Sequence, residues 1–207
     1  MIDTTLYFIT DSTGFSKEEF LSVVESACKG GVTLLQLREK DKTTREYIEL
    51  ADEVHAITQK YGIPLIIDDR VDVALAVNAE GVHVGQSDMP VCMARKLMGK
   101  GKIVGATTKT VEQAVEAYHQ GADYLGVGAI YPTTTKVKTV LTSVDTLKEI
   151  VKAVPIKVNA IGGLNVVNMG ILKGSGISGI CVVSAIMKSA DPQNSAVRLK
   201  EKFYELQ

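Results

Sequence analysis

The chain has 207 residues, of which 45% are hydrophobic and 23% are charged, and its formal net charge is −1. A chain of this length can bury a sizeable core, so we expect a single domain over residues 1–207. The nearly neutral charge creates no overall field that would favour nucleic acid or an anionic membrane surface, so neither is expected as a partner.

The three cysteines, Cys28, Cys92 and Cys181, are far apart and form no CxxC pair. This pattern is typical of free thiols in a reducing compartment, and we expect a cytoplasmic protein. Cys181 lies in an apolar run and is interpreted as a core residue. The first ten residues lack the basic and apolar regions of a signal peptide, and no apolar run is long enough to span a bilayer.

Short apolar runs rich in Val, Ile and Leu alternate with amphipathic segments along the chain. Such runs are typical of parallel strands that are buried on both faces. Eight strands are predicted: Leu6–Thr10, Leu34–Leu37, Leu65–Ile67, Gly81–Val84, Ile103–Ala106, Tyr124–Val127, Lys157–Ile161 and Gly179–Val182.

A helix is predicted after each strand. Ser16 precedes Lys17-Glu18-Glu19 and is a suitable N-cap. The segment from Thr43 to Tyr61 carries an apolar stripe with a helical period and ends at a glycine. His55 and His119 fall within helices and are expected to be exposed. Further helices are predicted at Val71–Asn78, Pro90–Met98, Val111–Gln120, Ser143–Ala153, Val166–Lys173, Ser184–Ser189 and Gln193–Glu205.

A strand followed by a helix, eight times over, predicts an α/β fold with a single (β/α)₈ TIM barrel. A doubly wound open sheet is the main alternative, but no G-x-G-x-x-G follows the first strand. In a barrel, the carboxyl ends of all strands open onto one face, where the functional groups gather. The polar residues at those ends are therefore the candidates for a site.

The second predicted strand leads into Gln36-Leu37-Arg38-Glu39-Lys40. Alternation along an extended segment places Gln36, Arg38 and Lys40 on the same side. Arginine can hold phosphate oxygens through two hydrogen bonds, and lysine adds a compact positive charge, so this side predicts an anion pocket. The alternative is a solvated run of surface charges.

The third and fourth predicted strands lead into acids: Asp68 and Asp69 after the third, and Asp88 after the fourth. A carboxylate beside a core is costly unless it is paired or bound to a metal. Acids from two strand ends that face one opening could hold a hard dication such as Mg²⁺, which implies a substrate with phosphates. Asp88 also fits the N-cap of a helix that begins with Pro90.

The remaining strand ends carry hydroxyls and glycines. Thr107 follows the fifth strand and could donate to a phosphate. The polar segment 128–139 suits a loop that closes over a ligand, although a plain polar loop is the alternative. Gly162-Gly163 allows backbone N–H groups to approach a phosphate held between the seventh and eighth loops, where Ser184 also fits a helix N-cap. No metal-ligating histidine pair or catalytic triad is evident.

These residues resemble the thiamine-phosphate synthase family, and the resemblance covers essentially the whole chain. The motifs that carry it are Gln36-Leu37-Arg38-Glu39-Lys40, Asp69-Arg70-Val71-Asp72, Gly81 to Pro90 (GVHVGQSDMP), Tyr131 to Lys136 (YPTTTK) and Ala160 to Asn165 (AIGGLN).

The resemblance implies a (β/α)₈ barrel that joins 4-amino-2-methyl-5-(diphosphomethyl)pyrimidine to a thiazole phosphate. The residues that would hold the pyrimidine diphosphate are Gln36, Arg38, Lys40, Asp68, Thr107 and Lys136. Those that would hold the thiazole phosphate are Thr133, Thr135, Gly163, Val183 and Ser184. Asp69 and Asp88 would bind Mg²⁺, the expected cofactor.

The implied mechanism is dissociative, with Arg38, Lys40 and Lys136 as the catalytic residues that neutralise the departing pyrophosphate together with Mg²⁺. The aminopyrimidine stabilises a methylene cation, and the thiazole nitrogen captures it. No protein nucleophile is required, which agrees with the residue pattern.

The chain departs from the family pattern at three positions. Asp68 stands where the family usually has Asn, and an ionised carboxylate cannot donate a hydrogen bond to a diphosphate. Lys138 stands where an acid is frequent, and Thr107 where Ser is more frequent. The first departure should weaken diphosphate binding unless Asp68 is protonated or joins the metal shell.

Two other functions remain open at this stage. A related thiazole tautomerase has a similar barrel but relies on a histidine near the fifth strand end, where this chain has Lys109. A non-catalytic barrel that senses a thiamine precursor is the other alternative, since fold does not fix function. The sequence leaves open homo-oligomer formation and the choice between a carboxylated and a decarboxylated thiazole.

Overall fold

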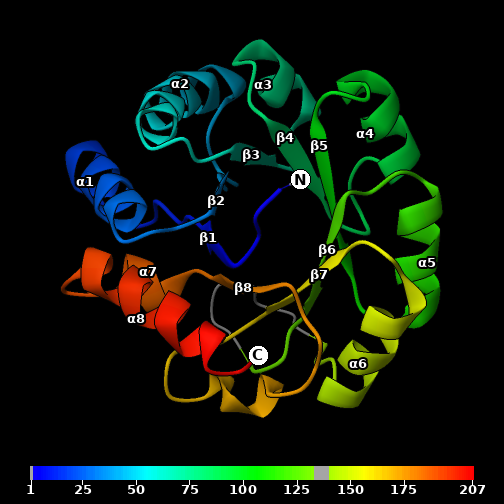
Figure 1. Ribbon diagram of the computed structural model, residues 1–207. Coiled ribbons are helices and arrows are strands. Elements are labelled where there is room, and N and C mark those ends of the chain that lie inside the picture. The colour runs from blue at the N-terminus through cyan, green and yellow to red at the C-terminus, as the bar shows by residue number, and fades with distance from the viewer. Residues whose placement is uncertain (1, 133–139) are drawn as a thin grey trace.

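The protein is a closed barrel of eight parallel strands that follow one another in chain order (Figure 1). The computed structural model describes residues 2–132 and 140–207. The first strand pairs with both the second and the eighth, which closes the ring and rules out an open doubly wound sheet. The predicted TIM barrel is thus confirmed. The strands are β1 (Leu6–Ile9), β2 (Leu34–Leu37), β3 (Leu65–Asp68), β4 (Gly81–Val84), β5 (Ile103–Thr108), β6 (Tyr124–Gly128), β7 (Lys157–Ile161) and β8 (Gly179–Val182).

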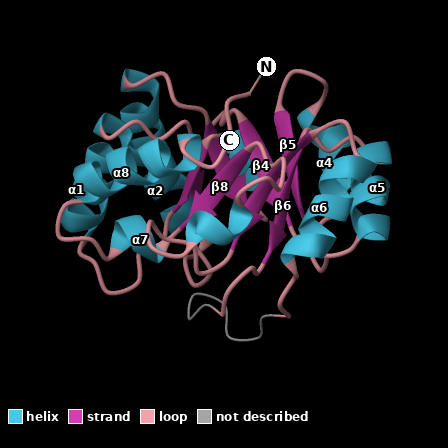
Figure 2. Ribbon diagram, turned by 60° about the horizontal axis from the view of Figure 1, so that its bottom comes forward, coloured by secondary structure: helices cyan, strands magenta, loops and turns pink. Residues whose placement is uncertain are grey.

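Helices surround the strands. Figure 2 shows α1, α2 and α8 on one side of the sheet and α4, α5 and α6 on the other. The first two helices begin at capping boxes, in which Ser16 and Thr43 exchange hydrogen bonds with a glutamate three residues later. The bounds are α1 (Lys17–Lys29), α2 (Thr44–Lys60), α3 (Val71–Ala76), α4 (Val91–Met98), α5 (Val111–His119), α6 (Val144–Ala153), α7 (Ser184–Met187) and α8 (Pro192–Tyr204).

The helix predicted over residues 166–173 is wrong, because this stretch is a turn followed by a short 3₁₀ helix, Met169–Leu172. The Asn165 side chain accepts hydrogen bonds from the backbone of Val167 and Asn168, and the Asn168 amide donates to the Gly163 carbonyl. These side chains compete with the backbone bonds of an α-helix, which is the usual reason that asparagine favours turns.

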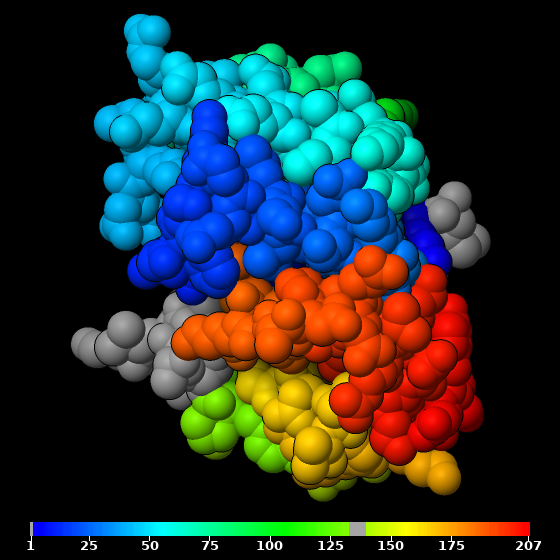
Figure 3. All heavy atoms as spheres, turned by 90° about the vertical axis from the view of Figure 1, so that its left-hand side faces the viewer, coloured from blue at the N-terminus to red at the C-terminus, as the bar shows by residue number. Residues whose placement is uncertain are grey.

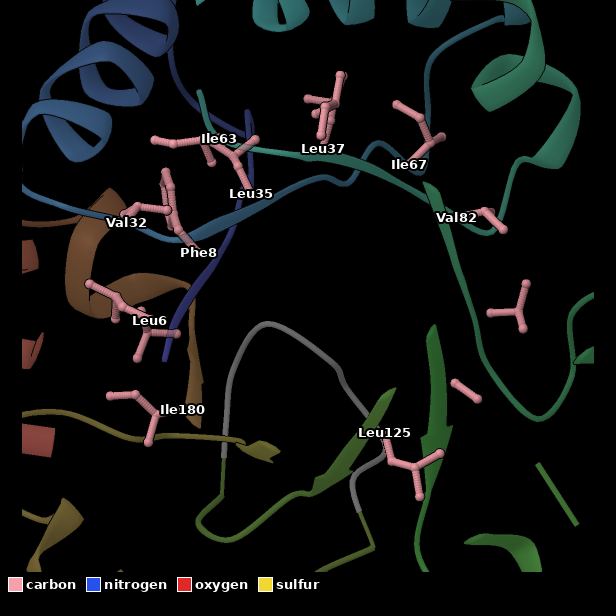
Figure 4. Packing of buried hydrophobic residues seen from close by; sticks show 14 of the residues in the cluster. Leu6, Phe8, Val32, Leu35, Leu37, Ile63, Ile67, Val82, Leu125 and Ile180 are labelled. Atoms are coloured by element: carbon pink, nitrogen blue, oxygen red, sulfur yellow. The ribbon is translucent and has the colours of Figure 1, made fainter. Parts of the chain in front are cut away.

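The apolar residues form two layers on either side of the strands. Alternate strand residues such as Phe8, Leu35 and Ile67 point outward and pack beneath the helices (Figure 4). A smaller cluster, which includes Tyr7 and Tyr124, fills the inside of the barrel. The strands are therefore buried on both faces, as their continuous apolar sequence predicted.

The first and last helices lie against each other and cover the place where the ring closes. Figure 3 shows the blue N-terminal elements beside the orange and red C-terminal ones. A Cβ at Gly30, which follows α1, would lie only 2.3 Å from the carbonyl oxygen of Gln193 in α8, so only glycine permits this approach. Lys200 of α8 also donates to the Gly31 carbonyl at 3.1 Å.

His55 of α2 was expected to be exposed, and this expectation is wrong. Its side chain is buried, with Nδ1 3.2 Å from the Val77 carbonyl oxygen and Nε2 3.2 Å from Glu80 Oε1. Glu80 also accepts from the Leu65 backbone N–H at 2.8 Å. The histidine thus joins α2 to the turn before β4, whereas His119 is exposed as predicted.

The helices that the structure describes are too short or too polar to span a membrane. No helix in residues 2–132 or 140–207 is both long enough and apolar enough to cross a bilayer.

The three cysteines are free thiols, of which Cys28 and Cys181 are buried and Cys92 is exposed. Burial raises the pKa of Cys28 to about 12 and raises that of Cys181 as well, so neither is a ready nucleophile.

Candidate active site

A cavity of about 370 Å³ opens at the carboxyl ends of the strands. Each of the eight strands contributes at least one residue to its lining. Every predicted site residue that the structure describes lies in this lining: Gln36, Arg38, Lys40, Asp68, Asp69, Asp88, Thr107, Gly163, Val183 and Ser184. Thr133, Thr135 and Lys136 lie outside the described residues, as does Lys138.

The predicted anion pocket lies along one side of the cavity. Gln36 is the last but one residue of β2 and is only 2% exposed, whereas Arg38 and Lys40 lie just beyond the strand. The Lys40 ammonium is 2.7 Å from Asp68 Oδ2 and also contacts Asp69, and Arg38 Nε is 3.7 Å from the same Asp68 oxygen. The charges therefore face the cavity and its acids, which argues against a plain solvated run.

Asp68 ends β3 and is buried, and its environment pulls its pKa in two directions. Burial raises the pKa of this carboxyl and outweighs the neighbouring positive charges of Lys40 and Arg38, which lower it. The Asp88 carboxylate adds a smaller contribution that also raises the pKa. Lys40 and Arg38 therefore contact the Asp68 carboxyl group at the place where they are predicted to bind a diphosphate.

Asp69 and Asp88 are the two residues that were predicted to bind a metal, and both line the cavity. Asp69 has a φ of 59°, a left-handed conformation that is uncommon for residues other than glycine, and its N–H donates to the His83 carbonyl at 2.8 Å. Asp88 accepts from the Gly85 N–H at 2.9 Å. Burial raises the pKa of Asp88, and the Asp69 carboxylate, which lines the same cavity, raises it further.

Two neighbouring carboxylates suit a hard dication, because the metal charge would relieve their repulsion. Within the described residues, however, no group of three or more histidines, cysteines and acids is placed to hold a metal. Mg²⁺ would therefore need oxygen ligands from phosphate or water in addition to Asp69 and Asp88, as is usual for this ion.

The alternative roles of Asp88 and Ser184 as helix N-caps are wrong. Pro90 occupies the N-cap position of α4, and no side chain caps that helix; the Asp88 carboxylate bonds to the Gly85 N–H instead. Ser184 is the first residue of α7, where the N-cap position belongs to Val183 and likewise lacks a side-chain bond. Both side chains are therefore left at the edge of the cavity.

Gly162 and Gly163 bring two loops together on the opposite side of the cavity. Their φ angles are 105° and 63°, a region that glycine adopts without steric cost. A Cβ at Gly163 would lie 2.8 Å from the Pro132 carbonyl oxygen, and one at Gly162 would lie 2.4 Å from the Ala129 Cβ. The glycine pair thus lets the loop after β7 pack tightly against the loop after β6.

The lining also contains residues that were not predicted as site residues, among them His83, Lys109 and Cys181. His83 is a buried residue of β4, and its Nε2 lies 2.9 Å from Thr107 Oγ1. The period of two along β4 was the available signal, because it turns His83 and Gly81 to the inside of the barrel. Lys109 follows β5 two residues after Thr107, so the same alternation indicated it.

Comparison with known proteins gives consistent similarities. The family model for thiamine monophosphate synthase matches residues 6–186. A thiamine-phosphate synthase from Clostridium tetani is 48% identical over 204 residues, which cover 99% of this chain and 98% of the relative. One from Enterococcus faecalis is 54% identical over 182 residues, covering 88% and 86%.

Solved structures agree with the sequence relatives. A thiamine phosphate pyrophosphorylase from Pyrococcus furiosus matches with a TM-score of 0.90 and 36% identity, covering 99% of this chain and 98% of that chain. A 3-hexulose-6-phosphate synthase matches with a TM-score of 0.73 at 16% identity, covering 96% and 99% of the two chains, and this likeness concerns the fold alone.

Proposed function

The chain belongs to the thiamine monophosphate synthase family, and we propose that it joins 4-amino-2-methyl-5-(diphosphomethyl)pyrimidine to a thiazole phosphate, forming thiamine phosphate and pyrophosphate. The resemblance that the sequence motifs predicted is confirmed. A transferase of this kind acts on two small phosphorylated molecules. We propose that the barrel is a single domain and that neither nucleic acid nor a membrane is its partner.

One observation carries the proposal: cations from the end of β2 and acids from the ends of β3 and β4 line one cavity. Arg38 and Lys40 provide the positive charge, and Asp69 and Asp88 provide hard oxygen ligands. A diphosphate carries enough negative charge to engage both cations, and its oxygens could share a metal with the two acids. A substrate with a single neutral group would leave most of these charges unused.

The chain's own residues would act mainly by holding charge and position. Arg38 and Lys40 would release part of their hold on Asp68 and bind the diphosphate oxygens, where they stabilise the charge that grows as the C–O bond breaks. Thr107 would donate to the same group. Mg²⁺, held by Asp69 and Asp88 when bound, would supply further positive charge to the leaving group. Lys136 is proposed to serve the same purpose from the loop after β6.

The thiazole phosphate is proposed to lie on the other side of the cavity, near Gly163, Val183 and Ser184. The left-handed glycine lets the backbone approach a ligand closely, and the Ser184 hydroxyl can donate to a phosphate oxygen. Thr133 and Thr135 are proposed to complete this site. Binding of the two substrates on opposite sides would bring the thiazole nitrogen to the methylene carbon without a protein nucleophile.

The proposed setting is a reducing cytoplasm, which the three free cysteines support. The decisive experiment is to mix the purified protein with both substrates and Mg²⁺ and to measure thiamine phosphate and pyrophosphate. Equal amounts of the two products are expected. Isomerised thiazole phosphate without pyrophosphate would instead indicate a tautomerase, and calorimetric binding without any product would indicate a sensor.

A further inference from the structure

A row of polar side chains crosses the inside of the barrel beneath the cavity. Gln36 Nε2 lies 2.6 Å from the Tyr7 hydroxyl, which lies 2.7 Å from the Tyr124 hydroxyl. The Tyr124 hydroxyl is 3.0 Å from His83 Nδ1, and His83 Nε2 is 2.9 Å from Thr107 Oγ1. We call these five residues the interior polar chain. Its ends, Gln36 and Thr107, are both predicted to bind the pyrimidine diphosphate.

The middle of the interior polar chain is buried among apolar residues. Tyr7 and Tyr124 are completely buried, and burial raises the pKa of both phenols, so each keeps its single proton. Burying the polar groups of Tyr7, Tyr124 and His83 costs free energy unless every donor and acceptor has a hydrogen-bond partner. Leucine or isoleucine side chains would fill the same space without this cost. We therefore infer that these three side chains have a function other than filling the barrel interior.

The hydrogen bonds can be satisfied in one direction. The amide nitrogen of Gln36 only donates, so the Tyr7 oxygen accepts and the Tyr7 proton goes to Tyr124. Tyr124 then donates to His83 Nδ1, and an imidazole that accepts at Nδ1 carries its proton on Nε2. His83 thus donates to Thr107 Oγ1. Because Thr107 accepts this bond, its own proton is available for an oxygen atom in the cavity.

The backbone around the interior polar chain is shaped to admit it. A Cβ at Gly105 of β5 would lie 2.1 Å from Tyr124 Cζ, so the phenol occupies the space of a missing side chain. A Cβ at Gly126 of β6 would lie 3.4 Å from His83 Cε1, in contact with the imidazole. Glycines at inward positions of two adjacent strands thus make room for Tyr124 and His83.

We propose that Tyr7, Tyr124 and His83 are positioning residues that hold the Thr107 hydroxyl as a hydrogen-bond donor to the leaving diphosphate. At the other end, the bond to Tyr7 uses an amide hydrogen of Gln36 and leaves the amide oxygen to accept from a ligand. This inference rests on the proposed function, because it takes the diphosphate as the ligand. It adds a set of buried groups that act through the residues of the cavity.

The kinetic test breaks the interior polar chain in the middle and at its end. Tyr124→Phe removes one hydroxyl and keeps the ring, and Thr107→Val removes the terminal donor at similar volume. We expect each to lower kcat by about tenfold, the scale of a misplaced or lost donor, with little change in the KM for thiazole phosphate. In the double variant, Tyr124→Phe should add less than about twofold, because the group it positions is gone.

Tyr47→Phe is the matched control. This buried tyrosine of α2 donates to the Leu37 carbonyl at 2.7 Å, belongs to the core layer between strands and helices, and lies outside the interior polar chain. Both Tyr47→Phe and Tyr124→Phe should lose stability, but only Tyr47→Phe should keep its kcat. The proposal would be overturned if the fold-reductions in kcat of the two single variants multiplied in the double variant. An unchanged kcat in Tyr124→Phe would also overturn it.

A second measurement does not depend on turnover. The ¹⁵N chemical shifts of His83, assigned by their loss in His83→Gln, report which ring nitrogen carries the proton. We expect the Nε2–H tautomer in the wild type; a proton on Nδ1 would reverse the direction of the bonds and refute the proposal. If the wild type made no thiamine phosphate, the proposed function would fail. The tautomer of His83 would still show the direction of the hydrogen bonds in the interior polar chain.

Discussion

Lys40 and Asp68 form an ion pair at the cavity, with 2.7 Å between the Lys40 ammonium and Asp68 Oδ2. The lysine is thus held by a buried carboxylate before any substrate arrives. A diphosphate must compete with this carboxylate for the same cation. An amide at position 68 would not compete in this way.

We expect Asp68→Asn to tighten the binding of pyrophosphate. The change removes a negative charge that faces Lys40 and Arg38, and an amide can also donate to a phosphate oxygen. The expected gain is about tenfold in affinity, the size of one partly screened charge interaction. Isothermal titration with pyrophosphate and Mg²⁺ measures it, with Asp72→Asn as control because Asp72 pairs with Arg70 instead. A loss of affinity would mean that Asp68 belongs to the metal shell.

Asp88→Asn is expected to raise the Mg²⁺ concentration that the reaction needs. The amide oxygen can keep the bond from the Gly85 N–H, so the local fold should persist, but it is a neutral and weaker ligand. We expect the half-saturating Mg²⁺ concentration to rise by about tenfold or more, the effect of losing one charged ligand. Rates measured across a Mg²⁺ series check this, and the exposed Asp52→Asn should behave as the wild type. An unchanged Mg²⁺ dependence would remove Asp88 from the metal site.

Lys109 lines the cavity, and its ammonium has no hydrogen bond or ion pair among the described residues. We expect Lys109→Gln to raise the KM for the anionic substrates by roughly threefold to tenfold, because it removes a positive charge from the cavity wall. Lys100→Gln removes the same charge from an exposed position and should have no such effect. Equal KM values in the two variants would show that Lys109 takes no part in substrate binding.

Glu80→Ala is expected to destabilise the barrel without changing its chemistry. The Glu80 carboxylate accepts from the Leu65 N–H and lies 3.2 Å from His55 Nε2, so its loss leaves the buried Leu65 N–H without a partner. We expect a loss of about 1–3 kcal/mol in the free energy of unfolding, the usual cost of such an orphaned group. Urea unfolding measures the loss, and kcat measured well below the transition should stay the same. Glu80→Gln keeps an acceptor oxygen and should lose less.

Much of the fold could be predicted from the sequence because the apolar runs and glycines mark strands and their ends. All eight strands were predicted to within two residues at either end. The failed helix at 166–173 shows the limit of this approach. The side chains of Asn165 and Asn168 took backbone bonds in this segment that a helix needs.

The site could be predicted in outline because carboxyl ends of barrel strands meet on one face. The strand ends gave Arg38 and Asp88 directly, and the structure brings both into one cavity. His83 was missed as a cavity residue because a histidine inside a strand carries no pattern that distinguishes filling from function. Its partner Tyr124 lies two strands away, and such pairing depends on register, which the sequence does not specify. The burial of His55 was missed because its partners, Val77 and Glu80, lie in a separate segment of the chain that packs against α2.

The pairing of β1 with β8 also bears on how the protein is made. Strand β1 is synthesised first but can pair with β8 only after residue 182 has been synthesised, and α8 emerges from the ribosome later still. Until then the growing sheet has two open edges that other chains could join. We therefore expect nascent chains to depend on chaperones until translation is almost complete, and early termination before residue 179 to give aggregates rather than a smaller working enzyme.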